Sequence, residues 1–289
     1  MAVLSIQSHV VYGYAGNTVA VFPLQRLGRE VWAVNTVEFS NHTGYGSWKG
    51  KALGGEFAQE LITGVEDRGV LGNCEAVLSG YLGDASVSAA ITEAVGKVKN
   101  KNPKALYCCD PVMGDVGRGF YVKPDIPDIF KKVLLPAADI VTPNQFELEA
   151  ITGITIKNTE DAKKAVNILH ETGPSVVLVT SFREKDGELS MLASDKKEIY
   201  KVTTPEIPLG KGVAGTGDMT TAVFLSRYLE TNDLKKTLEL CTSSVYRILE
   251  ISYNKYKDKG ETALIELDII NAQQELCSPS TYYKAVRLN

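Results

Sequence analysis

The 289-residue sequence has no excess of basic residues and no long apolar segment. Its 31 Lys and Arg against 35 Asp and Glu give a net charge of −4, whereas nucleic acid and anionic membranes are bound by basic surfaces. No stretch approaches the roughly 18 apolar residues that a membrane helix needs. The N-terminal apolar run is not preceded by Lys or Arg, as a signal peptide would be. We therefore expect a cytoplasmic protein that binds neither nucleic acid nor membrane.

The sequence also lacks the cysteine patterns of disulfide-rich and zinc-binding proteins. It contains five cysteines, an odd number, and no C-x-x-C pair. The phosphate-binding loop G-x-x-x-x-G-K-[ST] is absent as well. Mild acidity does not exclude an anionic substrate, because backbone N–H groups and a metal ion can bind phosphate without a basic surface.

Short apolar runs alternate along the chain with segments of helical periodicity. The runs are almost continuously apolar, which is typical of strands buried on both faces of a parallel sheet. We predict strands at residues 3–7, 30–37, 74–78, 105–109, 139–141 and 175–180. Helical faces are predicted at 57–65, 87–98, 162–169 and 234–248, with Asn158 capping the third helix and Gly173 just past its end. This alternation predicts an α/β fold.

The segment 181–204 departs from the alternation. Asp186 and Gly187 form a turn signal between two short runs, which predicts an antiparallel hairpin at the edge of the sheet. The sequence has no Ser/Gly-rich linker and no internal repeat. We therefore predict one α/β domain over residues 1–289, with a central, mostly parallel sheet flanked by helices.

Polar residues and glycines follow each predicted strand. Open α/β sheets bind ligands beyond the carboxyl ends of their strands. The corresponding segments are 8–9, 39–46, 79–83, 110–114, 142–147 and 180–181. Ordinary loop composition would explain any one of them, but their recurrence at every strand end predicts a ligand site along this edge.

The segment 212–226, GVAGTGDMTTAVFLS, places a glycine-rich turn before an apolar helix. Gly215, Thr216 and Gly217 let backbone N–H groups approach a ligand, and the helix N-terminus adds partial positive charge. Such a turn predicts an anion hole for a phosphoryl group in transfer. Asp218 at its mouth is placed to accept a proton from an attacking hydroxyl, although an Asp here can also simply cap the helix.

Asp110 and Glu147 are candidate metal ligands, because each follows a predicted strand. Two carboxylates at neighbouring strand ends can hold Mg²⁺ directly or through its waters. Each also has a structural explanation: Asp110 precedes Pro111 in a turn, and Glu147 lies in the first turn of a helix. For either carboxylate taken alone, the structural explanation is sufficient.

Six motifs in order resemble the pyridoxal kinase family of the ribokinase-like superfamily. The first two, SHVVYGYAGNTVAVFPLQRLG at 8–28 and SNHTGYGSWKG at 40–50, are highly specific to that family. They are followed by SGYLG at 79–83, DPVMGD at 110–115, TPNQFELE at 142–149 and the superfamily motif GTGD at 215–218. The resemblance covers nearly the whole chain. It implies a ribokinase-like fold and ATP-dependent phosphorylation of the 5′-hydroxyl of pyridoxal, and of pyridoxine and pyridoxamine, in vitamin B6 salvage.

The resemblance also implies roles for individual residues. Asp218 corresponds to the catalytic base, with the anion hole at Gly215, Thr216 and Gly217. Ser8 and Thr43 correspond to contacts of the pyridine ring. The same substrate pocket includes Val10, His42, Gly44 and Tyr81. The ATP and cation side corresponds to Asp110, Thr142, Asn144, Glu147, Thr180, Ser181, Gly215 and Gly217. Family members use Mg²⁺, often with K⁺ or Na⁺, and are usually cytoplasmic homodimers.

Two segments match no family pattern: 115–124, expected to form a lid over the phosphates, and the adenine side at 203–206 and 209–213, which includes Lys211. The residues also leave two alternatives open. One is a kinase of the same superfamily acting on hydroxymethylpyrimidine or a sugar, although 40–45 is poor in the carboxylates that sugar hydroxyls require. The other is a non-catalytic pyridoxal phosphate-binding protein, which would have no use for Asp110, Glu147 and Asp218 together.

Overall fold

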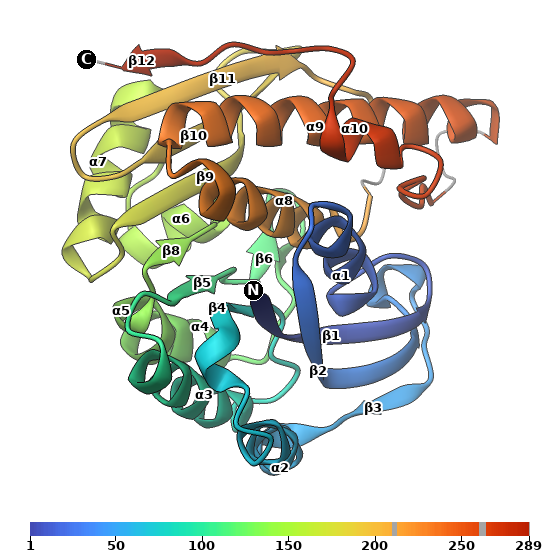
Figure 1. Cartoon of the computed structure of the whole chain (residues 1–289). Coiled ribbons are helices and arrows are strands. Elements are labelled where there is room, and N and C mark those ends of the chain that lie inside the picture. Colours follow the sequence, from blue (N-terminus) through green and yellow to red (C-terminus); the bar gives the residue numbers. More distant parts are fainter. Residues whose placement is uncertain (210–212, 260–263, 289) are drawn as a thin grey trace.

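The computed structural model describes residues 1–209, 213–259 and 264–288. Within them a ten-stranded sheet runs in the order β12-β11-β10-β9-β8-β5-β4-β1-β2-β3 (Figure 1). Its parallel part confirms the six predicted strands. These are β1 (Ala2–Tyr12), β2 (Glu30–Asn41), β4 (Cys74–Ser79), β5 (Leu106–Cys109), β8 (Ile140–Val141) and β9 (Val176–Phe182).

The first two strands run further than the sequence predicts. Beyond the apolar run, β1 and β2 continue to pair with each other as far as Tyr12 and Asn41, after a register shift between Gln7 and His9. Val11 and Tyr12 are 78% and 61% exposed there. The pattern of a buried strand therefore stops before the pairing does, which is why the sequence underestimates both lengths.

Antiparallel strands complete both edges of the sheet. The predicted hairpin is confirmed: β9 and β10 (Glu188–Ser194) flank the turn at Asp186 and Gly187, and β11 (Ile199–Pro205) follows. The outermost strand on this side is β12 (Val286–Leu288), which the sequence analysis does not predict. At the other edge, β3 (Gly50–Ala52) pairs with β2. A separate small hairpin joins β6 (Gly114–Asp115) to β7 (Gly119–Phe120).

Helices cover both faces of the sheet (Figure 1). One face carries α1 (Asn17–Arg26), α8 (Thr216–Thr231), α9 (Leu234–Tyr256) and α10 (Gln273–Cys277). The other carries α2 (Gly54–Glu66), α3 (Val87–Lys101), α4 (Ile126–Ile129), α5 (Leu135–Ala137), α6 (Gln145–Thr152) and α7 (Thr159–Glu171). Short helical turns lie at η1 (Thr43–Tyr45), η2 (Leu71–Asn73), η3 (Phe130–Leu134) and η4 (Lys257–Lys259).

Alternate residues of the central strands supply two cores. In β1, Val3 packs in the core beneath α1, α8 and α9, whereas Leu4 packs in the core beneath α2, α3 and α7. Leu178 and Val179 divide in the same way in β9. This two-sided burial explains the continuous apolar runs of the sequence. Among the helices in the described part of the chain, none is both long and apolar enough to cross a membrane.

The N-cap predicted for α7 is confirmed, but the predicted apolar face of α2 is only partly buried. Asn158 accepts a hydrogen bond from the Asp161 N–H at 3.0 Å. In α2, Phe57 and Leu61 are 41% and 38% exposed, and the buried residues are Gly55, Ala58 and Ile62. A Cβ on Gly55 would lie 2.2 Å from the Ser86 carbonyl oxygen. Because the two backbones approach so closely, the face with small residues packs inward. The sequence predicted the opposite face, which carries the larger apolar side chains.

Candidate active site

A cavity of about 950 Å³ opens at the carboxyl ends of the parallel strands. Its size is near the top of the range of small-molecule sites, so it has room for more than one ligand. Every site residue that the sequence predicts lines this single cavity. They are Ser8, Val10, His42, Thr43, Gly44, Tyr81, Asp110, Thr142, Asn144, Glu147, Thr180, Ser181, Gly215, Thr216, Gly217 and Asp218. The structure thus brings together residues from all six predicted motifs.

The glycine-rich turn leads directly into α8. Gly215 has φ of 78°, and a Cβ there would lie 2.2 Å from the Tyr14 carbonyl oxygen, so only glycine fits. The first N–H groups of a helix have no intrahelical acceptor, which leaves those at the start of α8 available to an anion. The Thr216 hydroxyl donates to the Val213 carbonyl at 3.1 Å and so braces the turn. This geometry is compatible with the anion hole that the sequence predicts.

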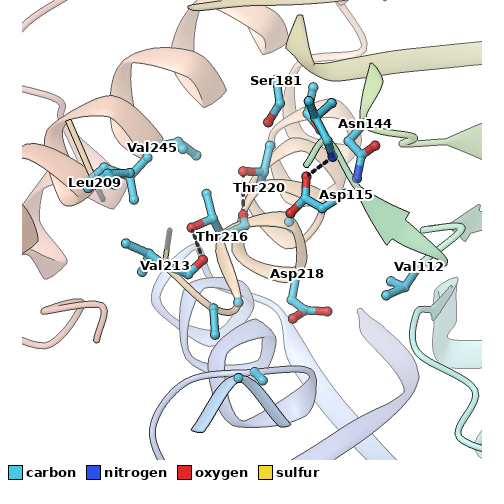
Figure 2. Close-up of a pocket in the computed structure, with 18 of the residues that line it drawn as sticks. Val112, Asp115, Asn144, Ser181, Leu209, Val213, Thr216, Asp218, Thr220 and Val245 are labelled. Atoms are coloured by element: carbon cyan, nitrogen blue, oxygen red, sulfur yellow. Dashed lines mark hydrogen bonds between the residues drawn. The ribbon is translucent and has the colours of Figure 1, made fainter. Parts of the chain in front are cut away.

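Asp218 points into the cavity from the first turn of α8 (Figure 2). Its Oδ2 accepts the Gly16 N–H at 2.9 Å, a contact between residues 202 apart in the sequence. Loss of solvation raises the pKa of Asp218, against the opposing effect of that hydrogen bond. A carboxylate with a raised pKa is a better proton acceptor near neutral pH. The structure thus gives Asp218 a geometry and a basicity that suit a general base.

Asp110 follows β5 and is buried at the floor of the cavity, with 4% of its surface exposed. Its Oδ2 accepts the Thr221 hydroxyl at 3.2 Å, and Thr221 and Thr142 share a hydrogen bond of 2.8 Å. Burial raises the pKa of Asp110 well above its ordinary value, and the nearby carboxylates of Glu147 and Asp218 raise it further. A cation beside these acids would relieve that repulsion.

Glu147 has the structural role that its position in α6 suggests. Its two carboxylate oxygens accept the N–H groups of Met113 and Asn144, each at 2.9 Å. Asn144 in turn accepts the Glu147 N–H at 2.9 Å, which completes a capping box. Burial raises the pKa of Glu147 despite these hydrogen bonds. Met113 and Asn144 follow β5 and β8, so the Glu147 carboxylate links the segments after these two strands. It also lines the cavity, as Asp110 does.

Two carboxylates are fewer than a self-sufficient metal site needs. In residues 1–209, 213–259 and 264–288, no three His, Cys, Asp or Glu side chains converge as metal ligands. A divalent ion at Asp110 and Glu147 would take its remaining ligands from water and from phosphate oxygens, as Mg²⁺ commonly does in nucleotide sites.

Ser181 has an unusual backbone conformation within β9. Its φ is 55°, and the pairing of β9 with β10 shifts register between Ser190 and Leu192, opposite this point. Non-glycine residues with positive φ cluster at ligand sites, where the surrounding structure maintains the strain. Thr180 beside it donates its N–H to the Pro143 carbonyl at 2.9 Å. Both residues line the cavity, and Figure 2 shows Ser181 there.

The pocket predicted for the pyridine ring lies where β1, η1 and β4 end. Ser8 is buried, and a Cβ on Gly16 would lie 2.1 Å from its carbonyl oxygen and 2.3 Å from its hydroxyl. Thr43 is exposed to the cavity in η1. Burial raises the pKa of Tyr81, so its phenol stays protonated and can donate a hydrogen bond. Together these groups form an apolar slot with a few directed hydroxyls, as a small aromatic ligand requires.

The same cavity has an apolar wall, of which only Leu209 lies in a segment that the sequence assigns to the adenine side. The wall is formed by Leu209, Val245, Leu249, Leu264 and Ile265. Leu209 and Val245 lie on the same side of the cavity (Figure 2). Val245 and Leu249 are four residues apart on α9, a spacing that also describes an ordinary core face. The wall is suited to a flat aromatic base. Lys211, considered above as a phosphate contact, lies outside the described residues.

The segment expected to form a lid contains β6 and β7. Phe120 packs edge-on against Phe146 of α6 with ring centroids 5.0 Å apart, and it is still 54% exposed. Arg118 at the turn of this hairpin and Arg183 after β9 both line the cavity. Neither arginine belongs to a recognised motif, so only the fold reveals them as candidates to contact an anionic ligand.

Comparison with known proteins agrees with this architecture. Residues 65–263 match the model of the phosphomethylpyrimidine kinase family. Over nearly its full length the chain is 48% identical to pyridoxal kinase PdxY from Rubrobacter xylanophilus, covering 99% of this chain and 97% of that protein. It is 47% identical to pyridoxal kinase PdxY from Granulibacter bethesdensis, covering 99% of both. The chain belongs to the pyridoxal kinase family.

Solved structures lead to the same assignment. The pyridoxal kinase of Leishmania donovani in complex with ADP and pyridoxamine superposes with a TM-score of 0.92 at 29% identity, covering 100% of this chain and 99% of that chain. The pyridoxal kinase of Entamoeba histolytica gives 0.89 at 27% identity, covering 99% of both chains. These similarities confirm the predicted α/β fold.

Proposed function

We propose that this chain is a pyridoxal kinase that transfers the γ-phosphoryl group of ATP to the 5′-hydroxyl of pyridoxal, and also of pyridoxine and pyridoxamine. One observation carries the proposal. Asp218 lies in the first turn of α8, where the Gly16 N–H donates a hydrogen bond to it. It faces a cavity that extends from Ser8 and Thr43 to Asn144 and Ser181. A base at the junction of two subsites is what transfer between two bound substrates requires.

The reaction follows from the positions of these groups. Ser8, Thr43 and Tyr81 orient the vitamer so that its 5′-hydroxyl reaches Asp218, which accepts the proton as the hydroxyl attacks. The N–H groups at Gly215, Thr216 and Gly217 bind the phosphoryl oxygens, and the positive end of α8 stabilises their charge. Phosphoryl transfer asks little covalent chemistry of the protein, so positioning and electrostatics provide most of the acceleration.

Asp110 and Glu147 fit a magnesium site completed by phosphate. Both are buried and carry raised pKa values, and the Asp218 carboxylate contributes to the raised pKa of Asp110, so a bound cation would favour their ionised forms. When bound there, Mg²⁺ would neutralise phosphate charge. Membership of the family also supports a K⁺ or Na⁺ requirement, a homodimer and a cytoplasmic location, each as a proposal to be tested on this chain.

A coupled assay of ADP release tests the function. Pyridoxal, pyridoxine and pyridoxamine are each supplied with ATP and Mg²⁺, with and without K⁺. Hydroxymethylpyrimidine and its phosphate serve as competing substrates, because the matching family model carries a phosphomethylpyrimidine name. We expect turnover with the vitamers and much less with the pyrimidines. A preference for the pyrimidines, or vitamer binding without ADP release, would refute the proposal in favour of one of the two alternatives.

A further inference from the structure

Glu266 lies outside every recognised motif, yet its carboxylate joins three separate segments. It is 7% exposed and follows Ile265, which lines the cavity and forms an isolated bridge with Val213. Its Oε2 accepts the Tyr14 N–H at 3.0 Å, and its Oε1 accepts the Tyr45 hydroxyl at 2.7 Å. The same Oε1 lies 3.1 Å from Nε2 of His42. These partners are 221 to 252 residues away in the sequence.

Each partner belongs to a part of the site. Tyr14 lies in the loop whose Gly16 N–H holds Asp218, and its carbonyl packs against Gly215. His42 and Tyr45 flank Thr43 in η1, and their rings pack 4.6 Å apart. The Glu266 carboxylate therefore fixes the vitamer side of the cavity relative to the base and the anion hole.

The same contact determines which polar atom His42 presents. Burial opposes ionisation of Glu266, but the hydrogen bonds from His42 and Tyr45 outweigh it and lower the pKa of Glu266. An ionised carboxylate only accepts hydrogen bonds, so Nε2 of His42 carries the proton. In a neutral imidazole, Nδ1 is then an acceptor. Nδ1 lies beside Gly44, where an added Cβ would be only 2.9 Å from it.

We propose that Glu266 is a positioning residue of the vitamer pocket, which holds η1 and the 13–16 loop in register with Asp218 and fixes the tautomer of His42. The inference rests on the proposed function and deepens it. Neither Glu266 nor its segment touches the reacting atoms in this scheme. Its effect reaches the substrate through His42, Thr43 and the loop that holds Asp218.

Glu266→Gln is the most direct test, because it keeps the shape and removes one acceptor. If its NH₂ faces the Tyr14 N–H, two donors oppose each other; if it faces His42 and Tyr45, those side chains must become acceptors, which changes the tautomer of His42. Either arrangement disturbs the 13–16 loop or η1, so pyridoxal affinity should weaken by about five- to fiftyfold. The KM for ATP should change by less than about twofold. Tyr45→Phe removes one donor, leaves the carboxylate intact and should have a smaller effect in the same direction.

Glu239 offers a matched control. It is 6% exposed, and it also accepts a backbone N–H, from Ala285 at 3.0 Å, and a tyrosine hydroxyl, from Tyr282 at 3.1 Å. It anchors the C-terminal segment to α9 and does not line the cavity. Glu239→Gln should therefore lower the melting temperature as Glu266→Gln does, while leaving pyridoxal affinity and both KM values unchanged.

Pyridoxal binding by calorimetry, kinetics with ATP, and ¹⁵N NMR of the imidazoles together decide the question. The chain has only three histidines, so the His42 resonances can be assigned by substitution. We expect the Nε2-protonated tautomer in the wild type and a changed tautomer in Glu266→Gln. If Glu266→Gln does not fold, Tyr45→Phe supplies the affinity measurement.

The possible failures are distinguishable. If the wild type binds pyridoxal but does not phosphorylate it, the proposed function fails while the binding data still test Glu266. If the wild type binds no vitamer, both proposals fail. If Glu266→Gln and Tyr45→Phe bind pyridoxal as the wild type does, or if Glu266→Gln changes both KM values equally, the positioning role of Glu266 is refuted.

Discussion

Replacing Asp218 by Asn removes the proposed base while keeping its shape. The amide oxygen can still accept the Gly16 N–H, a contact of 2.9 Å in the wild type. Positioned general bases contribute about 10²–10⁴-fold to rate, so kcat should fall by that factor, or by about 3–5 kcal/mol in activation free energy. The KM values for ATP and pyridoxal should change little, because Asn has nearly the same shape as Asp and both binding subsites keep their form.

The same substitution should not destabilise the fold. Loss of solvation raises the pKa of Asp218 in the folded state. A folded-state pKa above the unfolded one means that ionisation costs stability at pH 7, and that this cost disappears as pH falls through the folded-state pKa. The variant should therefore melt at or above the wild-type temperature at pH 7, with a difference that shrinks in acid.

Asp161 provides the matched control. It occupies the third position of α7, as Asp218 does in α8, so its charge also faces the positive end of a helix. Asp161→Asn should cost about 0.3–1 kcal/mol of stability and leave kcat unchanged. Coupled assays of ADP release and thermal unfolding separate the two effects. A kcat for Asp218→Asn within about threefold of wild type would refute the assignment of the base, and a large loss of melting temperature would indicate a structural role.

Further predictions concern a glycine, a cap and the pH profile. Gly16→Ala should abolish activity and destabilise the protein, since φ is 54° and the new Cβ would lie 2.1 Å from a backbone oxygen of β1. Gly28 also has a positive φ, 84°, but no atom lies within 4 Å of an added Cβ. Gly28→Ala therefore measures the cost of the backbone conformation without a steric clash. Asn144→Ala and Asn158→Ala each remove a cap worth about 1 kcal/mol by thermal unfolding, but only the former should raise the KM for ATP. Because the pKa of Asp218 is raised, kcat/KM should be lost in acid with an apparent pKa above the ordinary value of about 3.9; a limb at or below that value contradicts its role.

Sequence patterns predicted those parts of the fold that depend only on the residues within a segment. The runs that become β4, β5 and β9 are almost continuously apolar because alternate side chains enter two separate cores. Parallel strands also end at one edge, so residues that follow them, such as Asp110 and Thr142, meet in one cavity. The strands follow from the apolar pattern of buried parallel strands, and the position of the cavity follows from the tendency of open α/β sheets to bind ligands at the carboxyl ends of their strands.

Other features depend on contacts that no local pattern contains. The buried face of α2 is decided by Gly55 against the backbone of Ser86. The three residues of β12 become a strand only because β11 offers them an edge. Glu266 was missed for the same reason, since its donors lie more than 200 residues away. A buried carboxylate in a segment without a motif becomes informative only once its partners are known.

Several of the acidic residues of the chain line the cavity. Asp110, Glu147 and Asp218 lie close enough for the other two to raise the pKa of Asp110. Three acids would repel the phosphates of ATP unless a cation lay between them. In the proposed reaction, an acidic cluster beside a glycine-rich helix start would divide the work: backbone N–H groups would bind the phosphoryl oxygens, and the acids would favour ATP with its bound cation over the free nucleotide. A net charge of −4 is consistent with that arrangement, since neither task requires a basic surface.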